Sequence, residues 1–329
     1  MEFLPNEIIN HVRDYVIFKP TTKKSLQDAV ELWCEDRENA LTKYGHISIW
    51  DTSLINDMSF LFENKPQFND DISHWNVSSV TDMSSMFNNA HTFNQSLDNW
   101  DVSSVTNMHG MFWNACVFNQ PLENWNVSNV QSMECMFYYA NDFNRSINNW
   151  SVNNVTNMNE MFYCAKAFNQ PLENWNVSNV TTMHSMFFGS KAFNQPIEKW
   201  DVRSVTDMSK LFFYAMNFNQ PLNNWNVSSV TNMREMFYHA DSFDQPLDKW
   251  DISNVTDMSD MFENAHAFTQ LPEHWDMNRF DGMLYDMFGT HDINEVLHDS
   301  RLTQYYTNWR HRMISIFNTT QTGAIEGND

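Results

Sequence analysis

Glycine and basic residues are both scarce in this chain. Only 7 of its 329 residues are glycine, so we expect its turns to be built from Asn, Asp and Ser, which tolerate turn geometry and hydrogen-bond to their own backbone. Lys and Arg number 19 against 41 Asp and Glu, which gives a formal net charge of −22. This shortage of positive charge argues against binding to nucleic acid, whose phosphates need a basic surface, and against binding to anionic membranes.

Cysteine is also scarce, and long apolar runs are lacking. The four cysteines, Cys34, Cys116, Cys135 and Cys164, form neither a CxxC pair nor a regular series, which favours free thiols in a reducing compartment. No apolar segment is long enough to span a bilayer. The opening residues MEFLPNEIINHVRDYV lack the basic end and apolar run of a secretion signal. We therefore expect an intracellular protein without a membrane partner.

What the chain does have is a 25-residue repeat. Tryptophan recurs at Trp50, Trp75, Trp100, Trp125, Trp150, Trp175, Trp200, Trp225, Trp250 and Trp275. With Trp as position 1, Val or Ile follows at position 3, Val at 6, Met at 9, Met or Leu at 12, Phe at 13 and 19, usually Ala at 16, and Leu or Ile at 23. A fixed period of this length is the signature of a solenoid, in which each copy is stable only when stacked on its neighbours.

The spacing inside each copy predicts its secondary structure. Positions 9, 12, 13 and 16 follow the i, i+3, i+4, i+7 pattern of a helix, as in Met83, Met86, Phe87 and Ala90. Positions 19–25 favour a short strand or extended arm. Asn recurs at position 20, where we expect its amide to satisfy backbone groups of adjacent turns. The predicted fold class is thus an α/β solenoid of about nine to ten 25-residue turns.

The ends of the chain depart from the repeat. Residues 1–49 are expected to form a helical N-terminal cap, with amphipathic helices over 1–18 and 25–44. Ser25 is the expected N-cap of the second helix, and Tyr44-Gly45 the expected end.

We expect the solenoid to occupy residues 50–290. In its last copy, Met287 stands at position 13 instead of position 12, and such atypical terminal copies are expected of caps. Residues 291–317 are expected to form a helical C-terminal cap, and 318–329 a flexible tail.

The repeat unit W-[DN]-V-S-x-V-T-[DN]-M-x-x-M-F-x-x-A-x-x-F-N-Q-P-L resembles that of BspA-like and Mycoplasma-lipoprotein-type proteins over roughly residues 25–290. These repeats are regarded as variants of leucine-rich repeats, so the resemblance implies a leucine-rich-repeat-like solenoid. In bacteria it implies surface adhesion or binding of host proteins, which here requires an unrecognised export route. Similar repeats also occur in amoebal and giant-virus proteins, which implies the host cytoplasm or the virion as the location.

A second resemblance is confined to the start of the chain. Leu4, Pro5 and Ile8, followed by Val12, are similar to the L-P-x-E-I opening of F-box motifs. This implies docking on a ubiquitin-ligase adaptor through residues 3–18, and hence a substrate adaptor as an alternative function. The other interpretation is that this helix only caps the solenoid.

No enzyme signature is found in the sequence. GxGxxG, P-loop, HExxH, GxSxG and nucleophilic Cys/His patterns are all missing. His109 and His184 fall at position 10 and His239 at position 15, which look like variable surface positions. We therefore expect no catalytic residue, no cofactor and no metal site.

Position 14 varies in an informative way. Six central copies carry an aromatic residue there: Trp113, Tyr138, Tyr163, Phe188, Phe213 and Tyr238. On a helix, position 14 lies nearly opposite the apolar stripe, so these rings would form an outward apolar patch, which usually marks an interaction site. The alternative is that the helix stops near position 13 and the rings pack between turns. The sequence predicts a non-enzymatic scaffold whose partner is another protein.

Overall fold

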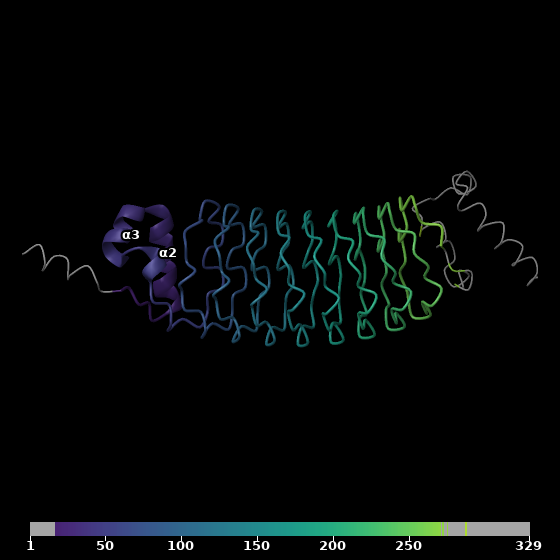
Figure 1. Cartoon of the computed structure of the whole chain (residues 1–329), viewed down its shortest axis with the longest axis horizontal. Helices are drawn as coiled ribbons and strands as arrows, with labels where there is room; N and C mark the ends of the chain where they lie inside the picture. The colour runs from purple at the N-terminus through teal and green to yellow at the C-terminus, as the bar shows by residue number, and fades with distance from the viewer. Residues whose placement is uncertain (1–16, 271, 273–274, 276–286, 288–329) are drawn as a thin grey trace, which may run out of the picture.

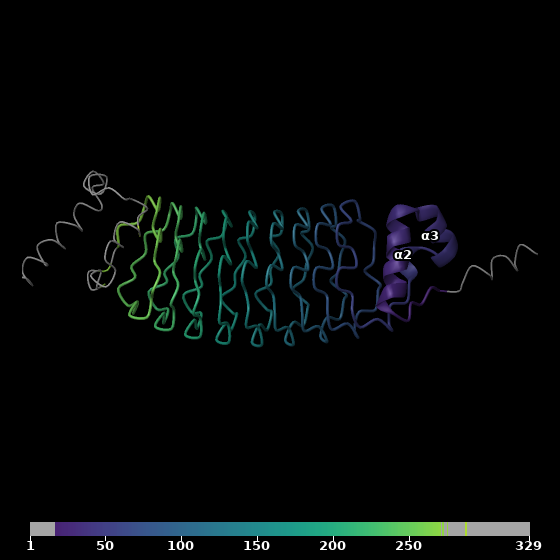
Figure 2. The same ribbon diagram turned by 180° about the vertical axis from the view of Figure 1, so that it is seen from behind.

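A computed structural model describes residues 17–270 together with residues 272, 275 and 287. Coil after coil lies side by side along one axis, with two helices at the N-terminal end (Figures 1 and 2). The predicted C-terminal cap at 291–317 and the tail at 318–329 lie outside the described residues, as does the predicted helix at 1–18 except for Ile17 and Phe18. In the described part of the chain no helix is long and apolar enough to cross a membrane.

The N-terminal helices are α2 (Lys23–Glu35) and α3 (Arg37–Tyr44), followed by the 3-10 turn η1 (Ile47–Ile49). The single helix predicted over 25–44 is wrong, because Asp36 ends α2 and its carboxylate caps the start of α3. The N-cap is Thr22, three residues before the predicted one, and Ser25 completes a capping box with it. Gly45, with a φ of 72°, ends α3 as expected.

These helices cover the first coil of the solenoid. Leu26, Ala29, Val30 and Trp33 form the buried face of α2. The Trp33 ring meets the Trp50 ring edge-on at 5.9 Å, and its indole nitrogen donates to Asp70 at 2.9 Å. Polar contacts between cap and coil therefore accompany the apolar packing.

Each coil is joined to the next by parallel backbone pairing at position 8, from Asp57 through to Asp257. Beyond this bridge, the N–H groups of positions 9, 11, 13 and 15 donate to carbonyls of the following coil. Met183, Ser185, Phe187 and Gly189, for example, donate to Asp207, Ser209, Leu211 and Phe213. The intervening N–H groups close tight turns within their own coil, as Met186 does on the Met183 carbonyl. Together these bonds satisfy the backbone along this segment.

The predicted helix at positions 9–16 is therefore wrong. Positions 11 and 15 have a positive φ in all nine coils, from Phe60 and Asn64 to Asp260 and Asn264. A left-handed residue at every fourth position breaks a helix, because a right-handed helix needs negative φ throughout. Of the two alternatives predicted for positions 19–25, a short strand or an extended arm, the strand is not found in the described coils, where the bridges between coils occur at position 8. A repeat solenoid is present, but its described coils consist of turns and isolated bridges.

The interior is a set of columns that run along the solenoid. The position-13 phenylalanines stack with their ring centroids 5.5 to 5.8 Å apart. Each also stacks on the position-19 ring of its own coil, as Phe162 does on Phe168 at 4.1 Å. The Trp residues form a further column, and each indole N–H from Trp75 to Trp250 donates to the backbone carbonyl 28 residues earlier in the chain.

Asparagine at position 20 forms the predicted ladder. The Asn169 side-chain oxygen accepts hydrogen bonds from the Asn194 backbone N–H at 2.9 Å and from the Gln195 amide at 3.0 Å. The same pattern recurs at Asn94, Asn144, Asn194 and Asn219. Where Asp244 replaces Asn, its oxygen accepts from the Thr269 backbone in the same way.

The one-residue shift of Met287 in the last copy is also seen in the structure. Phe262 donates its N–H to the Met287 carbonyl at 2.9 Å, 25 residues on, whereas Phe237 donates to Met261, 24 residues on. The last copy thus keeps this bond between coils by shifting its register by one residue.

Candidate protein-binding site

The six predicted aromatic residues of position 14 form one continuous row, which we call the aromatic ladder. Its rings are stacked from Tyr138 to Tyr238, and Trp113 packs on Tyr138 at an angle of 37°. Centroid distances are 4.5 Å from Trp113 to Tyr138, and 4.2 to 4.4 Å for each later step to Tyr238. All six side chains are half-buried. The rings pack between adjacent coils, as the second interpretation predicts, and they still reach the surface.

Local backbone geometry fixes where these rings lie. The Phe188 N–H closes a turn on the Ser185 carbonyl at 3.1 Å, and its own carbonyl accepts from Cys164 of the preceding coil at 2.6 Å. The same bonds recur at Phe213, whose carbonyl accepts from Gly189 at 2.6 Å. Because hydrogen bonds fix both the N–H and the carbonyl group of each position-14 residue, its ring is held directly over the next one.

The coils form a gently curved row (Figure 1), and the spacing of the rings indicates that the ladder lies on its inner side. Ring centroids are 4.2 to 4.5 Å apart in the ladder, 5.5 to 5.8 Å apart at position 13, and 6.3 to 6.4 Å apart between Trp125 and Trp150, Trp175 and Trp200, and Trp200 and Trp225. This steady increase means that the coils fan out towards the Trp column. Curved solenoids use their concave side as an extended binding surface.

Further aromatic side chains widen the ladder at position 15. Tyr139 is 36% exposed and lies 5.0 Å from Tyr138. Tyr214 lies 5.0 Å from Phe213 and stacks on His239 at 4.5 Å. Sequence reasoning missed this second row because position 15 is aromatic in only some copies.

The ladder tyrosines are neutral at physiological pH. Burial raises the pKa of Tyr163 to about 12 and raises the pKa of Tyr138 as well. Their hydroxyl groups therefore keep their protons and can donate hydrogen bonds to a partner.

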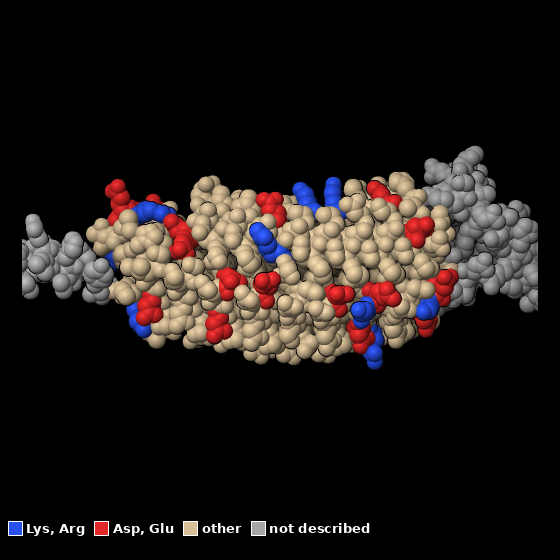
Figure 3. All heavy atoms as spheres, viewed as in Figure 1, with Lys and Arg blue, Asp and Glu red and all other residues tan. Residues whose placement is uncertain are grey.

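Positions 10 and 11 carry most of the charged groups beside the ladder. Lys210 lies 5.8 Å from the Phe213 ring and 3.4 Å from Glu235, and Arg234 pairs with Glu235 at 2.7 Å. Figure 3 shows one face of the molecule, where charged side chains are scattered among uncharged ones. The net negative charge is therefore not gathered into one patch on that face.

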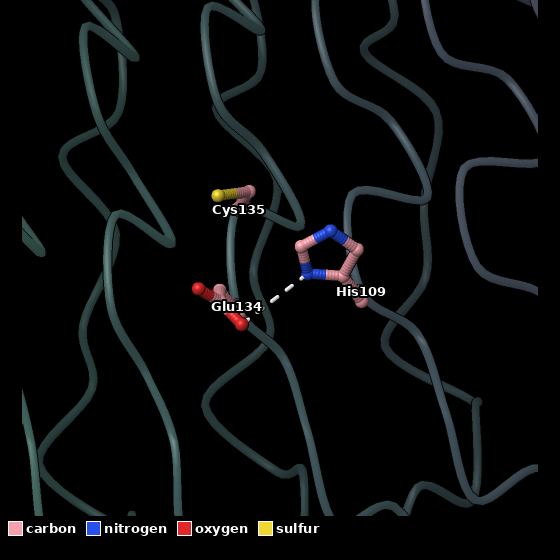
Figure 4. Close-up of side chains that lie close together, drawn as sticks. All are labelled: His109, Glu134 and Cys135. Atoms are coloured by element: carbon pink, nitrogen blue, oxygen red, sulfur yellow. Dashed lines mark ion pairs between the residues drawn. The ribbon is translucent and has the colours of Figure 1, made fainter.

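Among the residues that the structure describes, two side-chain clusters could hold a metal ion. His109, Glu134 and Cys135 come together at positions 10 and 11 of adjacent coils (Figure 4), and His239, Asp241 and His266 form a second group. The sequence analysis treated His109 and His239 as variable surface positions and missed both groups. The period itself was the available signal, since His109 and Glu134 occupy the same position in consecutive copies.

All four cysteines are free thiols. Burial, followed by the charge of Glu160, raises the pKa of Cys135. Burial also raises the pKa of Cys164. Without a metal, neither residue has the lowered pKa of a reactive cysteine.

The F-box-like residues Leu4, Pro5, Ile8 and Val12 lie outside the described residues. Their role as a docking segment stays a prediction.

Stacked columns, a 25-residue period and a concave aromatic row define the class of this protein as a repeat solenoid. The chain belongs to the family described as "Mycoplasma protein of unknown function, DUF285", which matches residues 35–150, 118–212 and 193–300. This match confirms the resemblance to the Mycoplasma-lipoprotein-type repeat. No curated protein matches the chain.

Proposed function

We propose that the chain is a non-enzymatic scaffold that binds another protein along the aromatic ladder. The observation that carries this proposal is the continuous row of six half-buried rings on the concave side, five of them stacked face to face. A contiguous exposed apolar surface usually marks an interaction site, and Tyr and Trp are enriched among residues that dominate binding energy.

The orientation of the rings indicates what they can contact. Because the inner rings of the ladder pack between rings on both sides, their faces are covered and their edges remain for a partner. Ring edges carry positive partial charge, which suits carbonyl oxygens and other acceptors of a polypeptide. Single-stranded nucleic acid binds by stacking bases on open ring faces and needs a basic groove, so the covered faces and the net charge of −22 both favour a protein partner.

The proposal places the protein inside a cell, in agreement with its four free thiols. A viral origin, the adhesin role and the ubiquitin-ligase adaptor role stay predictions.

The test uses the full chain as bait in extracts of its native cell. In the variant Tyr163→Ser/Phe188→Ser/Phe213→Ser, we expect the proteins retained by the wild type to be lost, while the circular dichroism spectrum stays unchanged. A matched control replaces three charged residues near the Trp column, in the variant Glu123→Ser/Glu173→Ser/Lys199→Ser, and should retain the same proteins as the wild type. Equal retention by the ladder variant would rule out the ladder as the binding surface.

A further inference from the structure

Three side chains of the kinds that bind zinc meet beside the N-terminal end of the aromatic ladder. His109, Glu134 and Cys135 each offer one ligand atom, and these atoms lie within 4.8 Å of one another. Figure 4 shows His109 and Glu134 facing each other from adjacent coils, with Cys135 next to Glu134 in the chain. We propose that these three residues bind one zinc ion, which would link the coil that begins at Trp100 to the coil that begins at Trp125.

The distances suit such an ion. Zinc bonds of about 2.0 to 2.3 Å in a tetrahedral arrangement place the ligand atoms roughly 3.3 to 3.6 Å apart. The His109 Nδ1 atom already lies 3.5 Å from the Glu134 Oε2 atom. The side chains of His109 and Glu134 are 38% and 37% exposed, so they can rotate to close the remaining gap to the sulfur. Cys135 is buried and supplies the fixed point of the site.

The surroundings of the cluster favour a cation. Asn157 donates a hydrogen bond to Glu134 Oε2 at 3.1 Å and so orients that carboxylate, as outer groups do in metal sites. The Cys135 thiol donates to Glu160 Oε2 at 3.4 Å, so a second carboxylate lies next to the sulfur. Glu160 can therefore supply a fourth ligand.

The mixture of ligand types selects the metal. Calcium and magnesium prefer oxygen ligands alone, whereas a sulfur, a nitrogen and a carboxylate oxygen together are typical of zinc. The second cluster, His239, Asp241 and His266, has no sulfur and therefore gives a different spectroscopic signal. The inference stands on these contacts and does not depend on the proposed function.

The test is a titration of the reduced, chelator-treated full chain with Co²⁺, which replaces zinc and reports its ligands by absorption. We expect a thiolate-to-cobalt charge-transfer band that saturates at one ion per chain and disappears when Zn²⁺ is added. The variant Cys135→Ser should lose the band, whereas Cys164→Ser, which alters a half-buried thiol outside both clusters, should keep it. Cobalt bound at the second cluster gives no such band, so it does not confuse the result.

Because Cys135 is buried and its serine variant could misfold, two variants at exposed positions test the same site. His109→Gln and Glu134→Gln change side chains that are more than a third exposed, and each should weaken cobalt binding at least about tenfold. The inference is overturned if the wild type shows no charge-transfer band, if Cys135→Ser keeps the band, or if both glutamine variants bind as tightly as the wild type.

Discussion

The position-13 column and the aromatic ladder at position 14 are one residue apart in every coil, yet they differ in every physical respect. Position 13 is Phe in all nine described coils, buried throughout, with rings 5.5 to 5.8 Å apart. Position 14 is half-buried, its rings are 4.2 to 4.5 Å apart, and its aromatic residues give way to Glu63 and Asn88 at one end and Glu263 at the other.

The difference shows that the position-13 column is required by the fold, whereas the aromatic ladder is a feature of the surface. A buried column must be occupied in every coil, because each ring fills the space between its neighbours and a missing ring leaves a cavity. The ladder is not required in this sense, since coils with Glu or Asn at position 14 keep the same backbone hydrogen bonds as the others. An aromatic row confined to the central coils is therefore a property of the surface.

The largest expected loss of stability comes from a substitution in the Trp column, whose residues are buried like those of position 13. Trp175 is 3% exposed, stacks on Trp200 at 6.3 Å, and donates to the Ile147 carbonyl at 3.0 Å. The variant Trp175→Ala should lower the free energy of unfolding by about 3–5 kcal/mol, because it leaves a large cavity. Trp175→Phe should lower it by about 1–3 kcal/mol, since it keeps a ring but leaves a smaller cavity and removes the indole hydrogen bond, while the Ile147 carbonyl still accepts from the Trp150 backbone N–H.

Urea denaturation followed by circular dichroism measures both Trp175 variants. If Trp175→Ala unfolds at the same urea concentration as the wild type, the Trp column does not hold the coils together.

A smaller effect is expected in the polar column at position 20. Asn169→Ala removes the oxygen that accepts from Asn194 and Gln195, and should lower the free energy of unfolding by about 1–3 kcal/mol. Asn169→Asp keeps that acceptor, as Asp244 does naturally, and should stay within about 1 kcal/mol of the wild type. Equal losses in the two variants, measured by the same urea titration, would mean that the acceptor is not what stabilises this column.

Much of the fold could be predicted from the sequence, because a strict period specifies which residues share an environment. The Trp, Met and Phe positions are buried as predicted, and the Asn ladder is present. The predicted helix failed because the spacing of positions 9, 12, 13 and 16 fits any backbone that turns one face inward. What decides the backbone is the bonding between coils, which a helix would prevent by using its N–H groups internally.

A signal against the helix was present in the sequence. Positions 11 and 15 carry Gly110, Gly189, Asn64, Asn89, Asn114 and Asn264, residue types that tolerate a left-handed backbone. The ladder could be predicted because its residues stand out from an otherwise constant repeat. For the His109, Glu134 and Cys135 cluster, the period could show that His109 and Glu134 share a position in consecutive copies, but it could not give the exposure of these side chains or the distance between adjacent coils.

The adjacent pair Phe187 and Phe188 tests the central claim most directly, since one residue belongs to the buried column and the next to the ladder. Urea denaturation of Phe187→Ala and Phe188→Ala compares the two positions within a single coil. We expect Phe187→Ala to lower the free energy of unfolding by about 3–5 kcal/mol and Phe188→Ala by about 1–2 kcal/mol, because Phe188 is only half-buried. Equal losses, or a larger loss for Phe188→Ala, would contradict the division between fold and surface.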